Sequence, residues 1–281
     1  MQRSSGSHAE QQVDRPERET PPRPVLSFSD VSLSFASPDG TTFDVLQQVS
    51  LEVRPNELCA IVGASGCGKS TLLNLAAGLI RPDRGTTSLN EDLVTTVNTR
   101  VGYVTQEANL LPWMTVRENL HLPLSIRKWP KSEREGRVEH WIDTVGLRGF
   151  EEHYPHELSG GMQKRCSIAR TLVYDPDVIL MDEPFGALDA MTKVVMQDEL
   201  LRIWQSERKT IVFITHDLVE AIALADRIVV MSKRPGRIRE VLPVMLPRPR
   251  DVYHLMDAPE ATQLYDQLWE LMRAEVTGRE S

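Results

Sequence analysis

The segment GASGCGKST (63–71) constrains the fold of this chain more than any other. It follows the short apolar run CAIVG (59–63), which has the composition of a fully buried strand. It opens the run KSTLLNLAAGL (69–79), in which apolar residues recur with helical spacing. The pattern G-x-x-x-x-G-K-[ST] between a strand and a helix is the Walker A phosphate-binding loop. The sequence therefore predicts a nucleoside-triphosphate site where this strand meets this helix.

The residue types in this loop suit the binding of a triphosphate. Its glycines allow the backbone to curl so that N–H groups face phosphate oxygens, and the following helix adds the positive end of its dipole. We expect Lys69 to reach the β- and γ-phosphates, Ser70 to bind Mg²⁺ and Thr71 to contact the α-phosphate. A plain glycine turn is the alternative, but it explains neither the lysine nor the Ser-Thr pair. The predicted cradle comprises Gly63, Ala64, Ser65, Gly66, Cys67, Gly68, Lys69, Ser70 and Thr71.

A second apolar run, VILMDEP (178–184), contains two acidic residues near its end. Asp182 stands at the carboxyl end of a predicted core strand, where a Walker B carboxylate holds Mg²⁺ through water. Glu183 follows it and points to the other side of the pleat, so we expect it to polarise the attacking water. Acids at strand ends can also be solvated caps. The Walker A loop in the same sheet favours the catalytic interpretation.

The order of the predicted elements defines an α/β fold. The alternating runs VSLSF (31–35) and VSLEV (49–53) predict antiparallel β structure near the start of the chain. A helix-rich subdomain is expected at about residues 107–175. Later apolar runs alternate with helical patterns, which is typical of a parallel sheet covered on both faces. These later runs are residues 178–182, 210–215 and 227–231.

The two ends of the chain differ from its middle. Residues 1–24 are polar and rich in proline, which predicts a disordered tail. We place the nucleotide-binding domain at 25–242 and a C-terminal helical extension at 243–281. The extension carries an apolar stripe that we expect to pack on its own domain. The stripe comprises Leu264, Leu268, Leu271 and Met272.

Composition excludes several other classes of protein. The formal net charge of −8 argues against a general electrostatic attraction to nucleic acid. No apolar run approaches the roughly 20 residues that cross a bilayer, and the first residues lack the apolar core of a secretory signal. The cysteines number 3 and are scattered, which argues for a reducing compartment. We therefore expect a cytosolic protein that is held to a membrane, if at all, by a partner.

The segment LSGGMQ (158–163) narrows the choice among phosphate-binding ATPases. Ser159, Gly160 and Gly161 open a new helix and so offer a hydroxyl, exposed N–H groups and a positive dipole end. This is a second phosphate-binding surface on the same chain. A serine N-cap with two turn glycines is the local alternative. One nucleotide cannot readily occupy both surfaces, so the plausible use is between two copies of the chain.

LSGGMQ resembles the signature motif of ATP-binding cassette (ABC) ATPases, and the resemblance spans roughly residues 25–235. Further matches come in the order that this family has. Gln106 resembles the Q-loop glutamine that senses Mg²⁺ and the attacking water, and Asp189 in ALDA (187–190) resembles the D-loop aspartate. His216 resembles the switch histidine that contacts the γ-phosphate, and Phe35 occupies the place of the aromatic residue that stacks on adenine.

The resemblance implies a P-loop NTPase of ABC type that hydrolyses ATP with Mg²⁺. It implies a parallel core sheet, an N-terminal antiparallel β subdomain and a helical signature subdomain. Two copies are expected to sandwich ATP, with Ser159 of one copy covering the nucleotide of the other. Glu183, His216, Gln106 and Lys69 are the catalytic residues implied in this way. Ser70, Gln106 and Asp182 are the implied metal-binding residues.

Several stretches resemble the branch that imports nitrate, taurine and aliphatic sulfonates. They are LLPWMTVREN (110–119), HYPHELSGGM (153–162), MDEPFGALDA (181–190) and RPGRI (234–238). The resemblance implies a subunit on the inner face of the cell membrane that drives transmembrane permease subunits and depends on a periplasmic solute-binding protein. Lys164 departs from the branch, because glutamine is usual at this position. The chain itself does not identify the solute.

Two side chains carry further expectations. Trp113 follows the Q-loop, where the resemblance implies docking of a permease helix, although packing within its own subdomain is a close alternative. Cys67 lies in the phosphate loop near a helix N-terminus, so we expect its thiol to be partly exposed, reactive and protected by MgATP.

Two other functions compete with transport. ABC ATPases that act on DNA or ribosomes usually carry a long coiled-coil or zinc insertion, or two tandem ATPase units, and this sequence has neither heptads nor CxxC pairs. A regulatory subunit that binds ATP without hydrolysing it would be expected to lack catalytic residues. Here every such position holds the working residue type. The sequence therefore favours an active transport ATPase.

Overall fold

The computed structural model describes residues 23–37 and 40–277, with the side chains of residues 274–277 excepted. Most of the predicted N-terminal tail lies outside these ranges. Its described end includes Arg23, whose Nη1 lies 2.8 Å from Oε1 of Glu91. In the described ranges, no helix is both long and apolar enough to cross a membrane.

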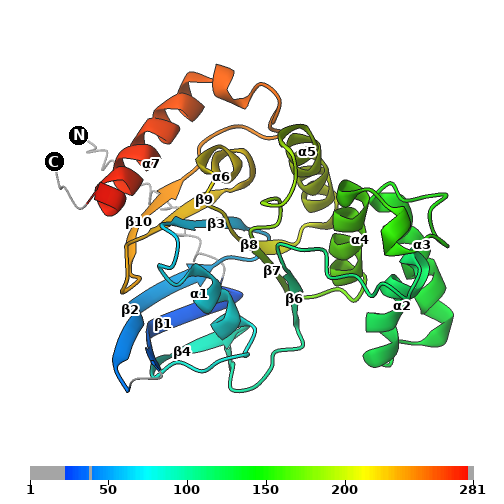
Figure 1. Cartoon of the computed structure of the whole chain (residues 1–281), viewed down its shortest axis with the longest axis horizontal. Helices are drawn as coiled ribbons and strands as arrows, with labels where there is room; N and C mark the ends of the chain where they lie inside the picture. Colours follow the sequence, from blue (N-terminus) through cyan, green and yellow to red (C-terminus); the bar gives the residue numbers. More distant parts are fainter. Residues whose placement is uncertain (1–22, 38–39, 278–281) are drawn as a thin grey trace, which may run out of the picture.

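The centre of the molecule is a six-stranded sheet with the strand order β10-β9-β3-β8-β7-β6 (Figure 1). Neighbouring strands run parallel, except that β10 is antiparallel to β9. The parallel sheet predicted from the apolar runs is thus confirmed. The strands are β3 (Leu58–Gly63), β6 (Val101–Val104), β7 (Val178–Asp182), β8 (Thr210–Ile214), β9 (Arg227–Met231) and β10 (Ile238–Pro243).

Both faces of this sheet are buried, because side chains alternate between two hydrophobic clusters. Along β7, Ile179 and Met181 join one cluster, whereas Val178 and Leu180 join the other. The same alternation occurs along β3, β8 and β9. This explains why the strands appear in the sequence as continuous apolar runs without a polar face.

One face is covered by α1 (Lys69–Ala76) and by a four-stranded antiparallel sheet of order β2-β1-β4-β5. Its strands are β1 (Leu26–Ala36), β2 (Thr42–Val53), β4 (Arg84–Leu89) and β5 (Asp92–Leu93). The predicted antiparallel start of the chain is therefore confirmed. Pairing of β1 with β2 places Phe35 opposite Phe43.

The other face is covered by α5 (Ala190–Glu207), α6 (Leu218–Leu224) and α7 (Pro259–Thr277) (Figure 1). A short 3-10 turn, η2 (Leu255–Asp257), precedes α7. Leu268 of α7 is fully buried, and the other stripe residues pack against the same cluster. The apolar stripe of the C-terminal segment therefore packs on this chain's own core, as the sequence predicts.

A separate group of helices stands beside the sheet, at the right of Figure 1. It comprises α2 (Val116–Ile126), α3 (Lys131–Thr144), the short 3-10 turn η1 (Pro155–Glu157) and α4 (Gly160–Leu172). A capping box starts α2: Thr115 Oγ1 accepts from Glu118 N at 3.2 Å, and Glu118 Oε2 accepts from Thr115 N at 2.9 Å. These helices lie within the interval that the sequence assigns to a helical subdomain.

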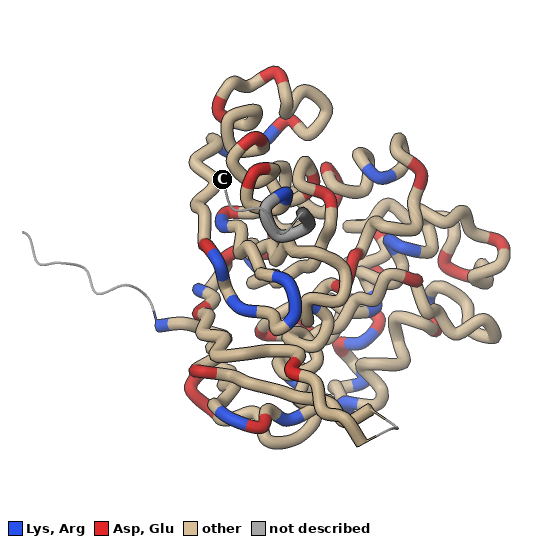
Figure 2. The backbone as a smooth tube through the Cα atoms, turned by 60° about the vertical axis from the view of Figure 1, so that its left-hand side comes forward, with Lys and Arg blue, Asp and Glu red and all other residues tan. Residues whose placement is uncertain are grey.

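Acidic and basic residues are interspersed along the chain (Figure 2). Several of them form ion pairs that join distant segments, such as Arg100 with Asp177 at 2.7 Å. A protein with this distribution gains little long-range attraction for a polyanion.

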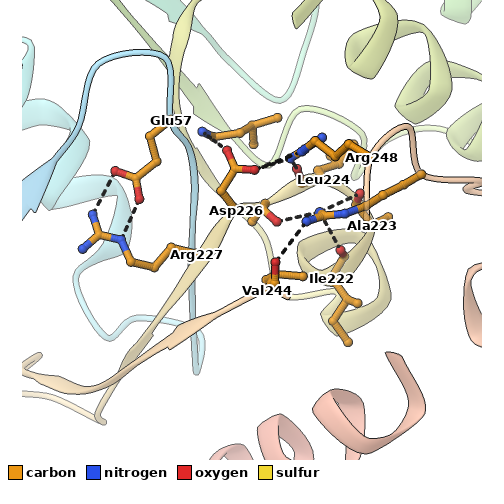
Figure 3. A network of polar contacts seen from close by, with 11 residues as sticks. Glu57, Ile222, Ala223, Leu224, Asp226, Arg227, Val244 and Arg248 are labelled. Carbon is orange, nitrogen blue, oxygen red and sulfur yellow. Dashed lines mark hydrogen bonds and ion pairs between the residues drawn. The ribbon is translucent and has the colours of Figure 1, made fainter. Parts of the chain in front are cut away.

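The segment between β10 and η2 is fastened to α6 by two arginines (Figure 3). Arg250 is buried, and its Nη1 donates to the carbonyl oxygens of Ile222, Ala223 and Ala225 at 3.1, 3.2 and 2.6 Å. Arg248 donates to Oδ1 of Asp226 at 2.7 Å. Burial lowers the pKa of Arg250 to about 10. The guanidinium groups thus satisfy carbonyls at and just beyond the end of α6 that the helix leaves without partners.

Candidate nucleotide-binding and catalytic site

A cavity of about 310 Å³ lies around the loop that joins β3 to α1. Four parts of the chain form it: the phosphate loop, the antiparallel sheet, the residue that follows β7 and the loop after β9. The lining residues are Phe35, Phe43, Val45, Ser65, Gly66, Gly68, Lys69, Ser70, Thr71, Glu183 and Arg234. The structure therefore brings together in one cavity most of the predicted cradle and the candidate catalytic glutamate.

The phosphate loop holds its lysine in a fixed position. Lys69 is only 7% exposed, and its Nζ donates to the carbonyl oxygens of Gly63 at 2.8 Å and Ala64 at 3.1 Å. Gly68 has φ +101°, and a Cβ there would lie 2.7 Å from Cδ2 of Leu46. The loop therefore needs glycine at this position for both its backbone conformation and its packing. This arrangement sets an ammonium group and the first turn of a helix at the cavity, which suits phosphate.

The expected partial exposure of the Cys67 thiol is wrong. Its side chain is 1% exposed, because the loop directs the thiol inward. Its Sγ lies 3.9 Å from Nζ of Lys69 and would be 2.8 Å from a Cβ on Gly63. Gly236 closes over the same segment, since a Cβ there would lie 2.0 Å from the Cys67 carbonyl oxygen. Cys67 therefore contributes backbone, and not an accessible thiol, to the cradle.

Asp182 is connected to the start of α1. Ser70 Oγ donates to Asp182 Oδ1 at 3.1 Å. Hydroxyl and carboxylate oxygens are ligands that Mg²⁺ prefers, so this pair fits the ion. Among the described residues, no group of three or more His, Cys, Asp or Glu could hold a metal. Phosphate oxygens and water would have to complete the ligand shell.

Tyr103 on β6 lies behind this pair and was not singled out in the sequence. Burial raises the pKa of its hydroxyl, and the Asp182 carboxylate raises it further. The hydroxyl also donates to Oδ1 of Asn74 on α1 at 3.2 Å. Tyr103 thus stays a neutral donor beside Asp182. Only its place in the strand VGYVT before Gln106 could have indicated this role.

Glu183 and His216 meet at the cavity. Nδ1 of His216 lies 3.1 Å from Oε2 of Glu183, and these side chains are 66% and 29% exposed. Glu183 has φ +44°, which is uncommon for a residue other than glycine. Its N–H nevertheless donates to the Ile214 carbonyl at 3.0 Å, which ties the end of β7 to β8. The strained backbone turns Glu183 out of the strand and toward the histidine.

Gln106 approaches the same glutamate from the end of β6. Gln106 Nε2 and Glu183 Oε2 lie 3.1 and 3.4 Å from the position that a Cβ would take on Gly186. The two side chains therefore meet over this glycine. The sequence identifies Gln106, Glu183 and His216 separately, and the fold brings them to one edge of the sheet.

An aromatic pair stands at the other end of the cavity. The rings of Phe35 and Phe43 are 6.3 Å apart and inclined by 57°. The guanidinium carbon of Arg234 lies 4.7 Å from the centre of the Phe43 ring. The sequence indicates Phe35 but misses Phe43 and Arg234, because strand pairing and a loop after β9 bring them there. The RPGRI segment was the available signal for Arg234.

The serine–glycine turn lies apart from this cavity. Ser159 caps α4 by accepting from Met162 N at 3.3 Å, and Gly160 lines a second cavity of about 450 Å³ together with Gln106. Asp189 caps α5 in the same way by accepting from Thr192 N at 3.1 Å. A Cβ on Gly161 would lie 3.1 Å from Cγ2 of Thr192, so the two helix starts are neighbours. Ser159, Gly160, Gly161 and Asp189 are not among the residues that line the nucleotide cavity.

The fold and the site together define a P-loop ATPase of the ATP-binding cassette type. The family model described as "ABC transporter" matches residues 46–186. The taurine import ATP-binding protein TauB of Roseobacter denitrificans is 46% identical over 215 residues, which are 76% of this chain and 80% of the relative. The aliphatic sulfonates import ATP-binding protein SsuB of Bacillus cereus is 43% identical over 227 residues, which are 80% of this chain and 88% of the relative.

A solved structure adds the quaternary arrangement of a similar protein. It is a dimeric ATP-binding cassette in a post-hydrolysis state bound to ADP and Pi, and it matches with a TM-score of 0.68 and 29% identity. The match covers 79% of this chain and 100% of that cassette. The chain therefore belongs to the ABC transporter family.

Proposed function

We propose that this ATPase energises the import of a small anionic solute, such as a sulfonate, taurine or nitrate, as a dimer that binds two MgATP. Relatives named for taurine and aliphatic-sulfonate import support the choice of solute class. The observation that carries the dimeric mechanism is the separation of the two phosphate-binding turns. Lys69 lies at the nucleotide cavity, whereas Ser159 is exposed elsewhere on the same chain.

Binding of ATP begins on a single chain in this proposal. Adenine stacks on Phe35, and the backbone of residues 63–68 surrounds the phosphates. Lys69 exchanges its carbonyl partners for phosphate oxygens, because charge-assisted bonds of this kind are stronger than bonds to neutral acceptors. Mg²⁺, when bound beside Ser70, Asp182 and Gln106, neutralises phosphate charge.

Hydrolysis then needs the second chain. Ser159 and the N–H groups of Gly160 and Gly161 from the partner cover the γ-phosphate and stabilise charge there in the transition state. Glu183 accepts a hydrogen bond from the attacking water and orients it. The side chain of Gln106 lies beside Glu183 and this water. His216 donates to the γ-phosphate, and its contact with Glu183 at 3.1 Å keeps both groups aligned.

A permease contact is proposed beside the second cavity. This cavity is lined by Q-loop residues, by Leu110 and Pro112, and by residues of α4. Trp113 next to it is 69% exposed, which favours a contact with a partner over packing inside its own subdomain. An exposed aromatic side chain at the rim of a groove suits the docking of a helix. The subunit would then lie on the cytoplasmic side of the membrane without entering it.

The substitution Glu183→Gln tests this function most directly. The amide cannot accept a proton, so turnover should fall by about 100-fold or more while ATP affinity stays within about twofold. The variant should also form a dimer that persists only with MgATP. Phosphate release, nucleotide titration and size-exclusion chromatography measure these three properties.

Arg202→Met is a suitable control, because Arg202 pairs only with Asp198 on the exposed surface of α5 in the contacts that the structure gives. It should leave all three properties unchanged. Hydrolysis by Glu183→Gln at the wild-type rate would exclude the assigned role of the glutamate. Copurification with nucleic acid, and not with a polytopic membrane protein, would overturn transport.

A further inference from the structure

A buried ammonium group connects the signature helix to the Q-loop. Lys164 lies on the second turn of α4 and is 3% exposed. Its Nζ donates to the carbonyl oxygen of Thr105 at 2.6 Å and to that of Gln106 at 3.1 Å. The backbone of Gln106 is therefore held directly by the helix that Ser159 caps.

A second side chain of α4 also donates hydrogen bonds to backbone carbonyls that follow Gln106. Arg170 donates through Nη1 to the Asn109 carbonyl at 2.9 Å and through Nη2 to the Ala108 carbonyl at 3.3 Å. Arg170 is half-buried, and this burial lowers the pKa of its guanidinium group. Residues 105–109 are thus attached to one helix at both ends. Lys164 provides the attachment next to the glutamine.

Burial of the Lys164 ammonium group costs free energy, because desolvation disfavours its charged form. A functional gain is therefore needed to account for a lysine at this position. Burial lowers the pKa of Lys164 to about 8, and the Glu220 carboxylate on α6 opposes that shift. Glu220 is itself 2% exposed and pairs at 2.9 Å with Lys193 of α5, which also pairs with Asp217 at 2.7 Å. These charges make the ammonium tolerable at the junction of α4, α5 and α6.

We propose that Lys164 is a positioning residue that sets the location of Gln106 from the signature helix. The inference rests on the proposed function, in which Gln106 acts at the γ-phosphate. When the partner's nucleotide engages Ser159, any shift of α4 is transmitted through Lys164 to the backbone of Gln106. The chain would thereby sense from inside one subunit whether its signature turn is occupied. A shift of about 1 Å is enough to change turnover substantially.

A double-mutant cycle tests this inference. Lys164→Met removes the donors and keeps an unbranched side chain, and Gln106→Ala removes the group that is positioned. We expect Lys164→Met to lower kcat by roughly tenfold with KM for MgATP changed by less than about threefold, because positioning is lost and binding is not. In the Gln106→Ala background, Lys164→Met should cause no further loss, because both changes act through one group.

Arg165→Met provides a matched control on the next residue of α4. Arg165 donates to the carbonyl oxygens of Val145 at 3.0 Å and Gly146 at 3.3 Å, so this change removes similar bonds that do not reach the Q-loop. It should leave kcat within about twofold of the wild-type value and should add to Gln106→Ala independently. If Lys164→Met does not fold, as judged by circular dichroism, Lys164→Ala also removes the donors, leaves room for water at the two carbonyls and enters the same cycle.

The outcomes separate the two proposals. Multiplicative losses for Lys164 and Gln106, an unchanged kcat for Lys164→Met, or an equal loss for Arg165→Met would overturn the positioning role while leaving ATP hydrolysis intact. A wild-type protein without ATP hydrolysis would overturn the proposed function and the inference with it.

Discussion

The starts of α1 and α4 offer the same chemistry to phosphate, but the fold treats them differently. Both begin at a glycine-containing turn with exposed N–H groups and a positive dipole end. At α1 the lysine is 7% exposed and bound to the loop's own carbonyls, and the cavity beside it is lined from four parts of the chain. At α4, Ser159 makes only its own capping bond among the hydrogen bonds given for its side chain, and it is exposed.

Because of this difference, the starts of α1 and α4 should depend differently on the partner chain. The α1 site is complete within one chain, so nucleotide affinity should belong to the monomer. The α4 turn lies outside the nucleotide cavity, and the cavity that Gly160 lines contains no phosphate-loop residue. The contribution of this turn should therefore appear only when another copy approaches. Substitutions at the two ends should therefore separate binding from turnover.

The largest expected effect is that of Lys69→Ala. The change removes the ammonium group that meets the phosphates, and loss of a charged hydrogen-bonding partner typically costs about 2–5 kcal/mol in binding. We expect ATP affinity to fall by 30-fold or more, roughly, and hydrolysis to be lost. Titration of a fluorescent nucleotide at low protein concentration measures the affinity of the monomer.

Ser159→Ala is the counterpart at the other helix. It should leave the affinity of the monomer within about twofold and reduce hydrolysis by about tenfold or more, as expected for loss of one donor that acts in the transition state. Removal of the cap should also lower stability by about 1 kcal/mol, which thermal unfolding measures separately. Equal losses of monomer affinity in both variants would contradict the assignment of the two turns to different chains.

A smaller effect is expected from Gly186→Ala. A Cβ at this position would press on Nε2 of Gln106 at 3.1 Å and would reach ordinary contact distance, 3.4 Å, from Oε2 of Glu183. The Gln106 amide must move by a few tenths of an ångström, so kcat should fall by several-fold to about tenfold with little change in ATP affinity. Steady-state kinetics with the monomer titration as a second readout checks this.

Gly160→Ala makes this test sharper, because a Cβ there would find its nearest neighbour, Cδ2 of Leu188, at 4.0 Å. The single chain accommodates the methyl group, and alanine is favourable in a helix. Thermal stability should therefore not fall. A loss of hydrolysis in this variant would have to arise from contact with a second chain, whereas full activity would contradict coverage of the nucleotide by this turn.

The sequence predicts the phosphate-binding start of α1 well, because the residues that determine it lie close together in the chain. Spacing, glycines and the strand before Lys69 suffice, and β7 and β9 match their predicted bounds. The sequence does not predict the roles of Phe43, Arg234 and Tyr103. These roles depend on strand pairing and on a loop about 200 residues from Phe35. In the sequence, Lys164 stands out only as a departure from the family. Its contact with the Q-loop depends on the tertiary packing of α4, which no local pattern encodes.

For Cys67 the local motif led to a wrong prediction of exposure, whereas the roles above were not predicted at all. Its thiol provides the test with the smallest expected effect. A motif states which residues form a loop but not which way each side chain points, and here the thiol faces the core. All three cysteines are buried, and burial raises the pKa of Cys59 and of Cys166 to about 12. An aromatic disulfide reagent should therefore react with fewer than one thiol per native chain, at a rate that MgATP hardly changes. Ser159→Cys should add one thiol that reacts rapidly in the absence of nucleotide and is protected when MgATP closes the dimer. Rapid labelling of Cys67 in the native wild-type chain would show that the inner side of the α1 loop opens. The two helix starts would then differ in whether a nucleotide is bound, and not in how the fold holds them.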